Sequence, residues 1–190
     1  MIVVSFLYWD IALAKYCRAL NPTIKNIAEV ITTFGIATWY MVISFILYLL
    51  FRFIYKNKLN AMRSLFVFLS LSFTGIFITI LKWIAGRHRA SALFNHGLYG
   101  FDYFAVGYDI SSFPSGHAQT AFTMATTLTI LCPKWGLPLF VIAGLVSISR
   151  IILTSHYLSD VIAGAGFGIL CTLAVKYYFD RKQIKLTTEM

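Results

Sequence analysis

Three short segments of this 190-residue chain carry the residue types that handle phosphate groups. The first is "PSGH", which supplies the hydroxyl of Ser115, the main-chain N–H of Gly116 and the imidazole of His117. It stands directly before an apolar run, where a helix is expected to begin. A helix N-terminus binds anions, and an imidazole can donate a proton to a leaving oxygen. This segment is therefore a candidate half of a phosphate site.

The second segment, "SRIILTSHYLSD", contains Arg150, His156 and Asp160. His156 and Asp160 are four positions apart, so on a helix they share one face. A carboxylate beside an imidazole fixes its tautomer and stabilises the cation that forms. The pair therefore has the composition of an oriented nucleophile, and the guanidinium of Arg150 can bind two phosphate oxygens at once.

The third segment, "KWIAGRHRA", contains Lys82 and Arg89, seven positions or about two helical turns apart. Both side chains match the charge of a phosphate. The three segments together favour phosphoryl transfer, with His156 as nucleophile and His117 as proton donor. Arg87 and His88 lie outside this spacing.

No part in the chemistry is expected for the other ionisable residues nearby. Arg87 and His88 are expected to be loop or lipid-headgroup contacts, and His96 and Asp102 to be loop residues.

The composition is that of an integral membrane protein. Hydrophobic residues make up 59% of the chain and charged residues 12%, against about 25% charged in soluble domains. The formal charge is +9, but the basic residues cluster beside apolar runs. They are interpreted as topology signals and contacts to anionic lipids, so no nucleic-acid partner is expected. The three cysteines are too widely spaced for a disulfide framework or a metal site, and we expect them to pack in apolar surroundings.

The hydropathy pattern predicts an all-α membrane bundle in a single domain, 1–190, with a transmembrane core at 27–179. The predicted spans are 27–51, 64–84, 116–132, 137–154 and 158–179. The third is short and begins with polar residues, so it is expected to face water or protein. Residues 1–22 carry Asp10, Lys15 and Arg18 among apolar residues, which favours an amphipathic helix in the membrane interface. A sixth span there is the alternative. The glycines of "GAGFG" are expected to allow close helix packing.

Five spans place the basic stretches "RFIYKNKLNAMR" and "DRKQIK" and the turn "CPKWG" on one side of the membrane. An excess of Lys and Arg marks the cytoplasmic side. The three phosphate-handling segments then lie at the opposite, outer face.

In this order, the three segments resemble the signature of the type 2 phosphatidic acid phosphatase superfamily, which includes vanadium haloperoxidases and bacterial acid phosphatases. Its pattern is Lys, six residues, Arg-Pro; then Pro-Ser-Gly-His; then Ser-Arg, five residues, His, three residues, Asp. The matching residues are Lys82, Arg89, Pro114, Ser115, Gly116, His117, Ser149, Arg150, His156 and Asp160. Ala90 stands where the family usually has Pro, a change that removes no functional group.

The resemblance implies that His156 attacks phosphorus and forms a phosphohistidine, while Asp160 holds its ring. It implies that His117 protonates the leaving oxygen. The residues implied in binding the phosphoryl oxygens are Lys82, Arg89, Ser115, Gly116 and Arg150. No metal and no other cofactor is implied, because the cationic side chains take that place.

The expected function is metal-independent hydrolysis of a phosphate monoester or diphosphate on a membrane lipid, at the outer face of the inner (cytoplasmic) membrane of a bacterium. Candidate substrates are phosphatidylglycerol phosphate, undecaprenyl diphosphate, phosphatidic acid and lipid A phosphates. One alternative is a lipid phosphotransferase that uses the same phosphohistidine. Another is a non-enzymatic phospholipid-binding protein. The expected partners are the bilayer and the lipid substrate, and the sequence indicates no oligomeric state.

Overall fold

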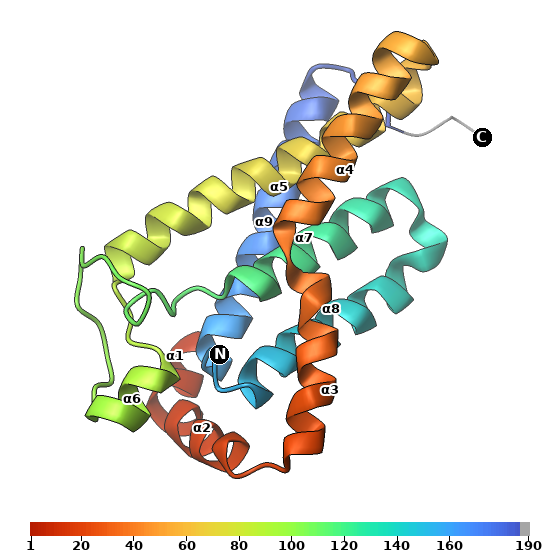
Figure 1. The fold of residues 1–190 in the computed structure, drawn as a ribbon. Coiled ribbons are helices and arrows are strands. Elements are labelled where there is room, and N and C mark those ends of the chain that lie inside the picture. The colour runs from red at the N-terminus through yellow and green to blue at the C-terminus, as the bar shows by residue number, and fades with distance from the viewer. Residues whose placement is uncertain (187–190) are drawn as a thin grey trace.

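The computed structural model describes residues 1–186, which are almost entirely helical, so the predicted all-α class is confirmed (Figure 1). Within this range the one β-type contact is an isolated bridge between Arg87 and Phe101. The elements are α1 (Ile2–Val4), η1 (Ser5–Trp9), α2 (Asp10–Arg18), α3 (Pro22–Thr32), η2 (Thr33–Gly35), α4 (Ala37–Leu49), η3 (Leu50–Ile54), α5 (Lys58–Ala85), α6 (Ala90–His96), α7 (Gly116–Leu131), η4 (Pro133–Trp135), α8 (Gly136–Ile152) and α9 (Leu158–Arg181).

Helix α7 lies at the centre of the bundle and packs against α5, α8 and α9 (Figure 1). Small residues make the contact with α9 close. A Cβ added at Gly164 would lie 2.4 Å from the carbonyl oxygen of Ser115, and one at Gly168 would lie 2.6 Å from that of Gln119. The expected packing role is confirmed for these two glycines, whereas Gly166 faces open space.

Four helical segments are long and apolar enough to cross a membrane. They are Pro22–Ile54, Lys58–Ala85, Pro133–Ile152 and Leu158–Arg181. They coincide with four of the five predicted spans. The fifth, α7, has 16 residues, about 24 Å of helix against a hydrocarbon thickness of about 30 Å. Eight of its residues are buried in the bundle, so it faces protein as expected. The exact number of spans stays a prediction.

The first of these segments bends where the 3₁₀ turn η2 separates α3 from α4. The following residue, Ile36, has extended backbone angles. Gly35 in this bend lies against the start of α7, because a Cβ there would be 2.8 Å from Cδ2 of His117. The bend therefore brings the outer helix into contact with a predicted site residue.

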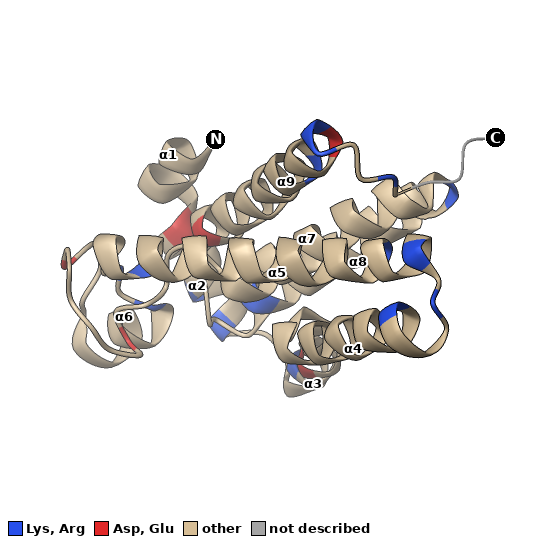
Figure 2. Ribbon diagram, turned by 90° about the horizontal axis from the view of Figure 1, so that it is seen from above, with Lys and Arg blue, Asp and Glu red and all other residues tan. Residues whose placement is uncertain are grey.

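The N-terminal helices pack on α8 and on the beginning of α9. Lys15 and Arg18 are exposed, as expected for an amphipathic helix. Asp10 is not on the polar face: it is 1% exposed and points into the bundle, where other groups bind its carboxylate. Figure 2 shows acidic positions where α2 meets the beginning of α9. The interfacial location of residues 1–22 stays a prediction.

All three cysteines are free thiols. Cys17 and Cys171 are buried, as expected of packing residues. Cys132 is exposed at the end of α7, where the chain turns towards α8. The packing interpretation is wrong there, because the side chain of Cys132 is exposed.

Candidate active site

His156 lies in the turn between α8 and α9 and is 3% exposed. Its Nδ1 atom lies 2.8 Å from the main-chain carbonyl oxygen of Ser112 and 3.6 Å from Oδ2 of Asp160. A carbonyl oxygen can only accept a hydrogen bond, so Nδ1 carries the proton and Nε2 keeps its lone pair. Burial lowers the pKa of His156 to about 4, although Asp160 pulls the other way. The ring is therefore neutral at neutral pH, with its orientation fixed and the lone pair of Nε2 free.

The main-chain carbonyl of Ser112 is thus the closer partner of the His156 ring, and the expected part of Asp160 in orienting the ring stays a prediction. The ring of His156 takes its tautomer from the carbonyl of Ser112, and the carboxylate stands beside the ring as a fixed negative charge. Asp160 Oδ2 accepts hydrogen bonds from Ser112 Oγ at 2.6 Å and from the N–H of Tyr157 at 2.9 Å. Its Oδ1 accepts one from Arg87. Its position in the first turn of α9 also suits a negative charge.

Arg87 lies in the loop between α5 and α6, but it is buried, with 0% exposure, so it is not a headgroup contact. Its Nη1 donates to Asp160 and, at 2.7 Å, to Ser159 Oγ, and its Nη2 donates to Asp10 at 2.7 Å. Burial opposes the charge, but Asp160 and Asp10 outweigh it and raise the pKa of Arg87. The sequence signal for this network was Asp10 itself, an ionisable residue inside an apolar run.

His88 is also buried, at 7% exposure, so it is not a headgroup contact. Its Nε2 lies 3.0 Å from Oδ2 of Asp102, which is an exposed loop residue as predicted. His96 is not in a loop: it is the last residue of α6, and it is exposed.

Lys82 and Arg89 converge on Ser111. The ammonium group of Lys82 donates to the carbonyl oxygen of Ser111 at 2.6 Å, and Arg89 Nη2 reaches the Ser111 hydroxyl at 3.3 Å. Arg89 Nε also donates to the carbonyl oxygen of Tyr108 at 2.9 Å. Gly86 makes the turn between the two basic residues with a φ of +54°, and a Cβ there would overlap main-chain atoms of the following loop. The turn therefore needs glycine.

His117 is the second residue of α7, and it lies within electrostatic range of Lys82, Arg89, Arg150 and His156. The predicted residues from all three segments therefore meet at one end of the bundle. The loop that follows α5, the start of α7 and the turn after α8 hold them there.

Among the predicted site residues, Ser115 Oγ and Arg150 Nε are buried without a hydrogen-bond partner in the part of the chain that the structure describes. Arg150 is anchored through Nη1, which donates to Thr32 Oγ1 on α3 at 2.9 Å. Nothing lies within 4 Å of where a Cβ of Gly116 would be. Free donors, an open main-chain position and several cations together suit an anion with several oxygens.

A cavity of about 330 Å³ adjoins the site, and the two share Arg89. Arg18 lies on its wall, with its guanidinium 4.2 Å from the ring centre of Phe94. Ser91 and Asn95 add polar groups to the lining. The cavity therefore offers donors, acceptors and an aromatic face next to the cations.

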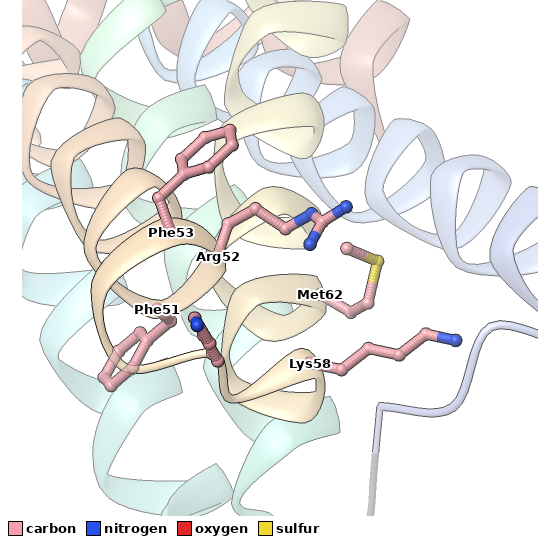
Figure 3. A pocket seen from close by; sticks show the side chains of 6 residues that line it. Phe51, Arg52, Phe53, Lys58 and Met62 are labelled. Atoms are coloured by element: carbon pink, nitrogen blue, oxygen red, sulfur yellow. The ribbon is translucent and has the colours of Figure 1, made fainter.

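A second cavity, of about 570 Å³, lies at the other end of α5, where Lys58 is about 36 Å of helix away from Lys82. Figure 3 shows its lining side chains. They are Phe51, Arg52, Phe53, Lys56, Lys58 and Met62. Within residues 1–186, no group of three or more His, Cys, Asp or Glu side chains could hold a metal ion.

The sequence pattern of the PAP2 superfamily matches residues 63–184, more than half of the chain. The lipid A 1-phosphatase of Rhizobium johnstonii is 28% identical over 190 residues, covering 95% of this chain and 77% of that protein. The undecaprenyl-diphosphatase of Sulfolobus acidocaldarius is 50% identical over 54 residues, which cover 28% of this chain and 26% of that protein.

Two solved structures share the fold. LpxE of Aquifex aeolicus superposes with a TM-score of 0.67 at 23% identity, over 89% of this chain and 95% of that one. The transmembrane PAP2-type phosphatidylglycerolphosphate phosphatase of Bacillus subtilis gives a TM-score of 0.58 at 22% identity, over 93% and 86%. The family expected from the three segments is confirmed: the chain belongs to the PAP2 superfamily, as a membrane enzyme of its lipid phosphatase class.

Proposed function

We propose that this enzyme hydrolyses a lipid phosphate through a phosphohistidine on His156, without a metal ion. The observation that carries the proposal is the state of this ring. Its Nδ1 is held by the carbonyl of Ser112 at 2.8 Å, and its burial keeps it neutral. Lys82 and Arg89 lie within electrostatic range of the ring and can neutralise the phosphoryl oxygens during attack.

In the first step, Nε2 of His156 forms a bond to phosphorus while the bond from phosphorus to the lipid oxygen breaks. His117 gives a proton to that leaving oxygen. In the second step, a water attacks phosphorus, the N–P bond breaks and His117 takes up the proton of the water. The products are inorganic phosphate and the dephosphorylated lipid. Arg150, Ser115 and Gly116 bind phosphoryl oxygens in both steps.

The substrate class that we favour is a sugar phosphate on a lipid of the lipid A type. A relative that covers 95% of this chain is named a lipid A 1-phosphatase. The adjoining cavity, with Arg18, Asn95 and the ring of Phe94, suits a sugar better than it suits glycerol. Undecaprenyl diphosphate, phosphatidylglycerol phosphate and phosphatidic acid are the competing substrates.

We place the enzyme in the inner membrane, with the site at the outer face. The cavity of Figure 3 presents Arg52, Lys56 and Lys58 at the opposite end of α5, where cytoplasmic anionic lipids would bind. Trp9 and Tyr16 are exposed on the N-terminal helices, as is common for residues at the membrane–water boundary.

The test is phosphate release by the purified protein in detergent with EDTA, on a panel of the four lipid classes, beside His156→Ala. We expect release that survives EDTA, is lost in the variant and is fastest with lipid A. Arg18→Ala should lower kcat/KM for lipid A about tenfold and leave the value for phosphatidic acid within about twofold. Release that EDTA abolishes, or that the variant retains, would contradict the mechanism. Release only after an acceptor lipid is added would favour the phosphotransferase.

A further inference from the structure

Asp10 is a buried carboxylate that the N-terminal helix α2 brings to the site from outside the matched region 63–184. It is 1% exposed. Its Oδ1 accepts hydrogen bonds from Ser5 Oγ and from the N–H of Ser159, each at 3.0 Å. Its Oδ2 accepts from Arg87 at 2.7 Å and from Ser159 Oγ. Four donors thus hold one carboxylate, which fixes its position.

Arg87 joins this carboxylate to Asp160. One guanidinium nitrogen, Nη1, donates to Asp160 and the other, Nη2, donates to Asp10. Both carboxylate side chains are 0% exposed, and that of Arg87 is 1% exposed. Because two carboxylates face one guanidinium, the group keeps a net charge of −1. Without Asp10, Arg87 and Asp160 would form a neutral pair beside His156.

The N-terminal segment also covers this group. The guanidinium carbon of Arg87 lies 4.9 Å from the ring centre of Phe6 and 4.6 Å from that of Tyr157. Tyr99 donates from its hydroxyl to the carbonyl oxygen of Phe6 at 2.9 Å, and its ring also faces the guanidinium of Arg87. Aromatic rings in place of water strengthen the charge interactions inside.

Phosphorylation of His156 places positive charge on its ring, because Nδ1 stays protonated while Nε2 binds phosphorus. A net negative group beside the ring stabilises that charge as it develops. We propose that Asp10 is a positioning residue for the reaction, which acts through Arg87 to hold Asp160 in place and to preserve the negative charge that it presents to His156. The N-terminal helix is then part of the active site. This inference rests on the proposed phosphohistidine mechanism.

The test compares Asp10→Asn with Glu29→Gln, an acid-to-amide change at an exposed position of α3. In the full-length protein with a lipid phosphate substrate, Asp10→Asn should lower kcat by about tenfold to a hundredfold, the range expected for misplacement by about 1 Å. KM should stay within about twofold. The control should match the wild type in both.

The pH profile separates positioning from folding. With less negative charge beside it, His156 protonates at lower pH, so the acid limb of kcat/KM should move to lower pH in Asp10→Asn. A loss caused by unfolded protein would lower the rate equally at every pH. A uniform loss that equals the unfolded fraction, or unchanged kcat, would overturn the inference.

Arg87→Lys keeps the positive charge but has one nitrogen in place of the two that bind Asp160 and Asp10. It is the variant to measure if Asp10→Asn does not fold. It should cause a similar loss of kcat, and where both variants fold their losses should not multiply in the double variant. Losses of kcat that multiply in the double variant would overturn the inference. A wild-type enzyme that releases no phosphate, or forms no phosphohistidine, would instead overturn the proposed function.

Discussion

The carbonyl oxygen of Ser112 lies 2.8 Å from Nδ1 of His156, closer than any carboxylate oxygen of Asp160, the nearest of which is at 3.6 Å. The ring therefore takes its tautomer from the main chain. The Ser112 hydroxyl meanwhile donates to the carboxylate at 2.6 Å, so one residue fixes both partners. Ser112 therefore acts on His156 through its main chain and on Asp160 through its side chain.

Ser112→Ala keeps the carbonyl and removes the hydroxyl. It should lower the free energy of unfolding by about 1–3 kcal/mol, since a buried hydrogen bond to a charged acceptor is lost. The rate should fall by less than about tenfold, because the tautomer of His156 is unchanged. Thermal unfolding in detergent and steady-state kinetics measure both effects. A loss of activity as large as that of His156→Ala would assign the tautomer to the hydroxyl instead.

Asp160→Asn removes one of the two carboxylates that neutralise Arg87. Breaking a buried ion pair typically costs about 3–5 kcal/mol, and a drop of that order in the free energy of unfolding is expected. Asp180→Asn is the matched control, because Asp180 binds Lys176 on the exposed side of the same helix α9. Asp180→Asn should lower the free energy of unfolding by less than about 1 kcal/mol. Equal losses in the two variants would contradict the buried network.

Protonation of His156 should make stability depend on pH. Its pKa is about 4 in the folded chain against an ordinary value of 6.5. Between these values the unfolded chain binds a proton that the folded chain does not, so the free energy of unfolding falls as pH drops from 6.5 to 4. The fall is at most roughly 3 kcal/mol.

The measurement is thermal unfolding of the wild type and His156→Gln at pH 7 and at pH 4.5. Gln cannot titrate, so the wild type should lose more stability on acidification than the variant. Identical losses would mean that the imidazole is not held neutral by the fold.

Gly35→Ala should displace His117, the proposed proton donor. The new Cβ would lie 2.8 Å from Cδ2 of His117 and 2.9 Å from Cγ1 of Val146, closer than such atoms approach. We expect kcat to fall by about tenfold to a hundredfold through misplacement of the ring. Gly144→Ala is the control, because nothing lies within 4 Å of a Cβ there. An unchanged kcat in Gly35→Ala would place His117 outside the proton transfer.

The sequence predicted the parts of this molecule that follow from spacing along the chain. Apolar runs of the right length predicted four of the membrane helices. The four-residue spacing predicted that His156 lies near Asp160, although His156 stands in the turn before α9 and not on the helix. The basic residues of the three segments were singled out because their charge matches that of a phosphate, and the structure brings them to one end of the bundle.

Contacts between distant segments could not be predicted in this way. Asp10 and Ser159 are 149 positions apart, and the charge of Asp10 fitted the polar face of an interfacial helix equally well. Arg87 was interpreted as a loop or headgroup contact because it lies outside the spacing of the three segments, and only the two facing carboxylates make its burial favourable. The part of Ser112 that holds His156 is a main-chain carbonyl, which every residue type carries.

The most direct test of the central claim is to trap the phosphorylated enzyme. The wild type would be mixed with a lipid substrate labelled in its phosphate, quenched in alkali within the first turnover and analysed for label on protein. The proposed mechanism predicts a phosphohistidine that is stable in base, labile in acid and located at residue 156, with none in His156→Gln. Phosphate release without labelled protein at any quench time, or label that persists in His156→Gln, would contradict it.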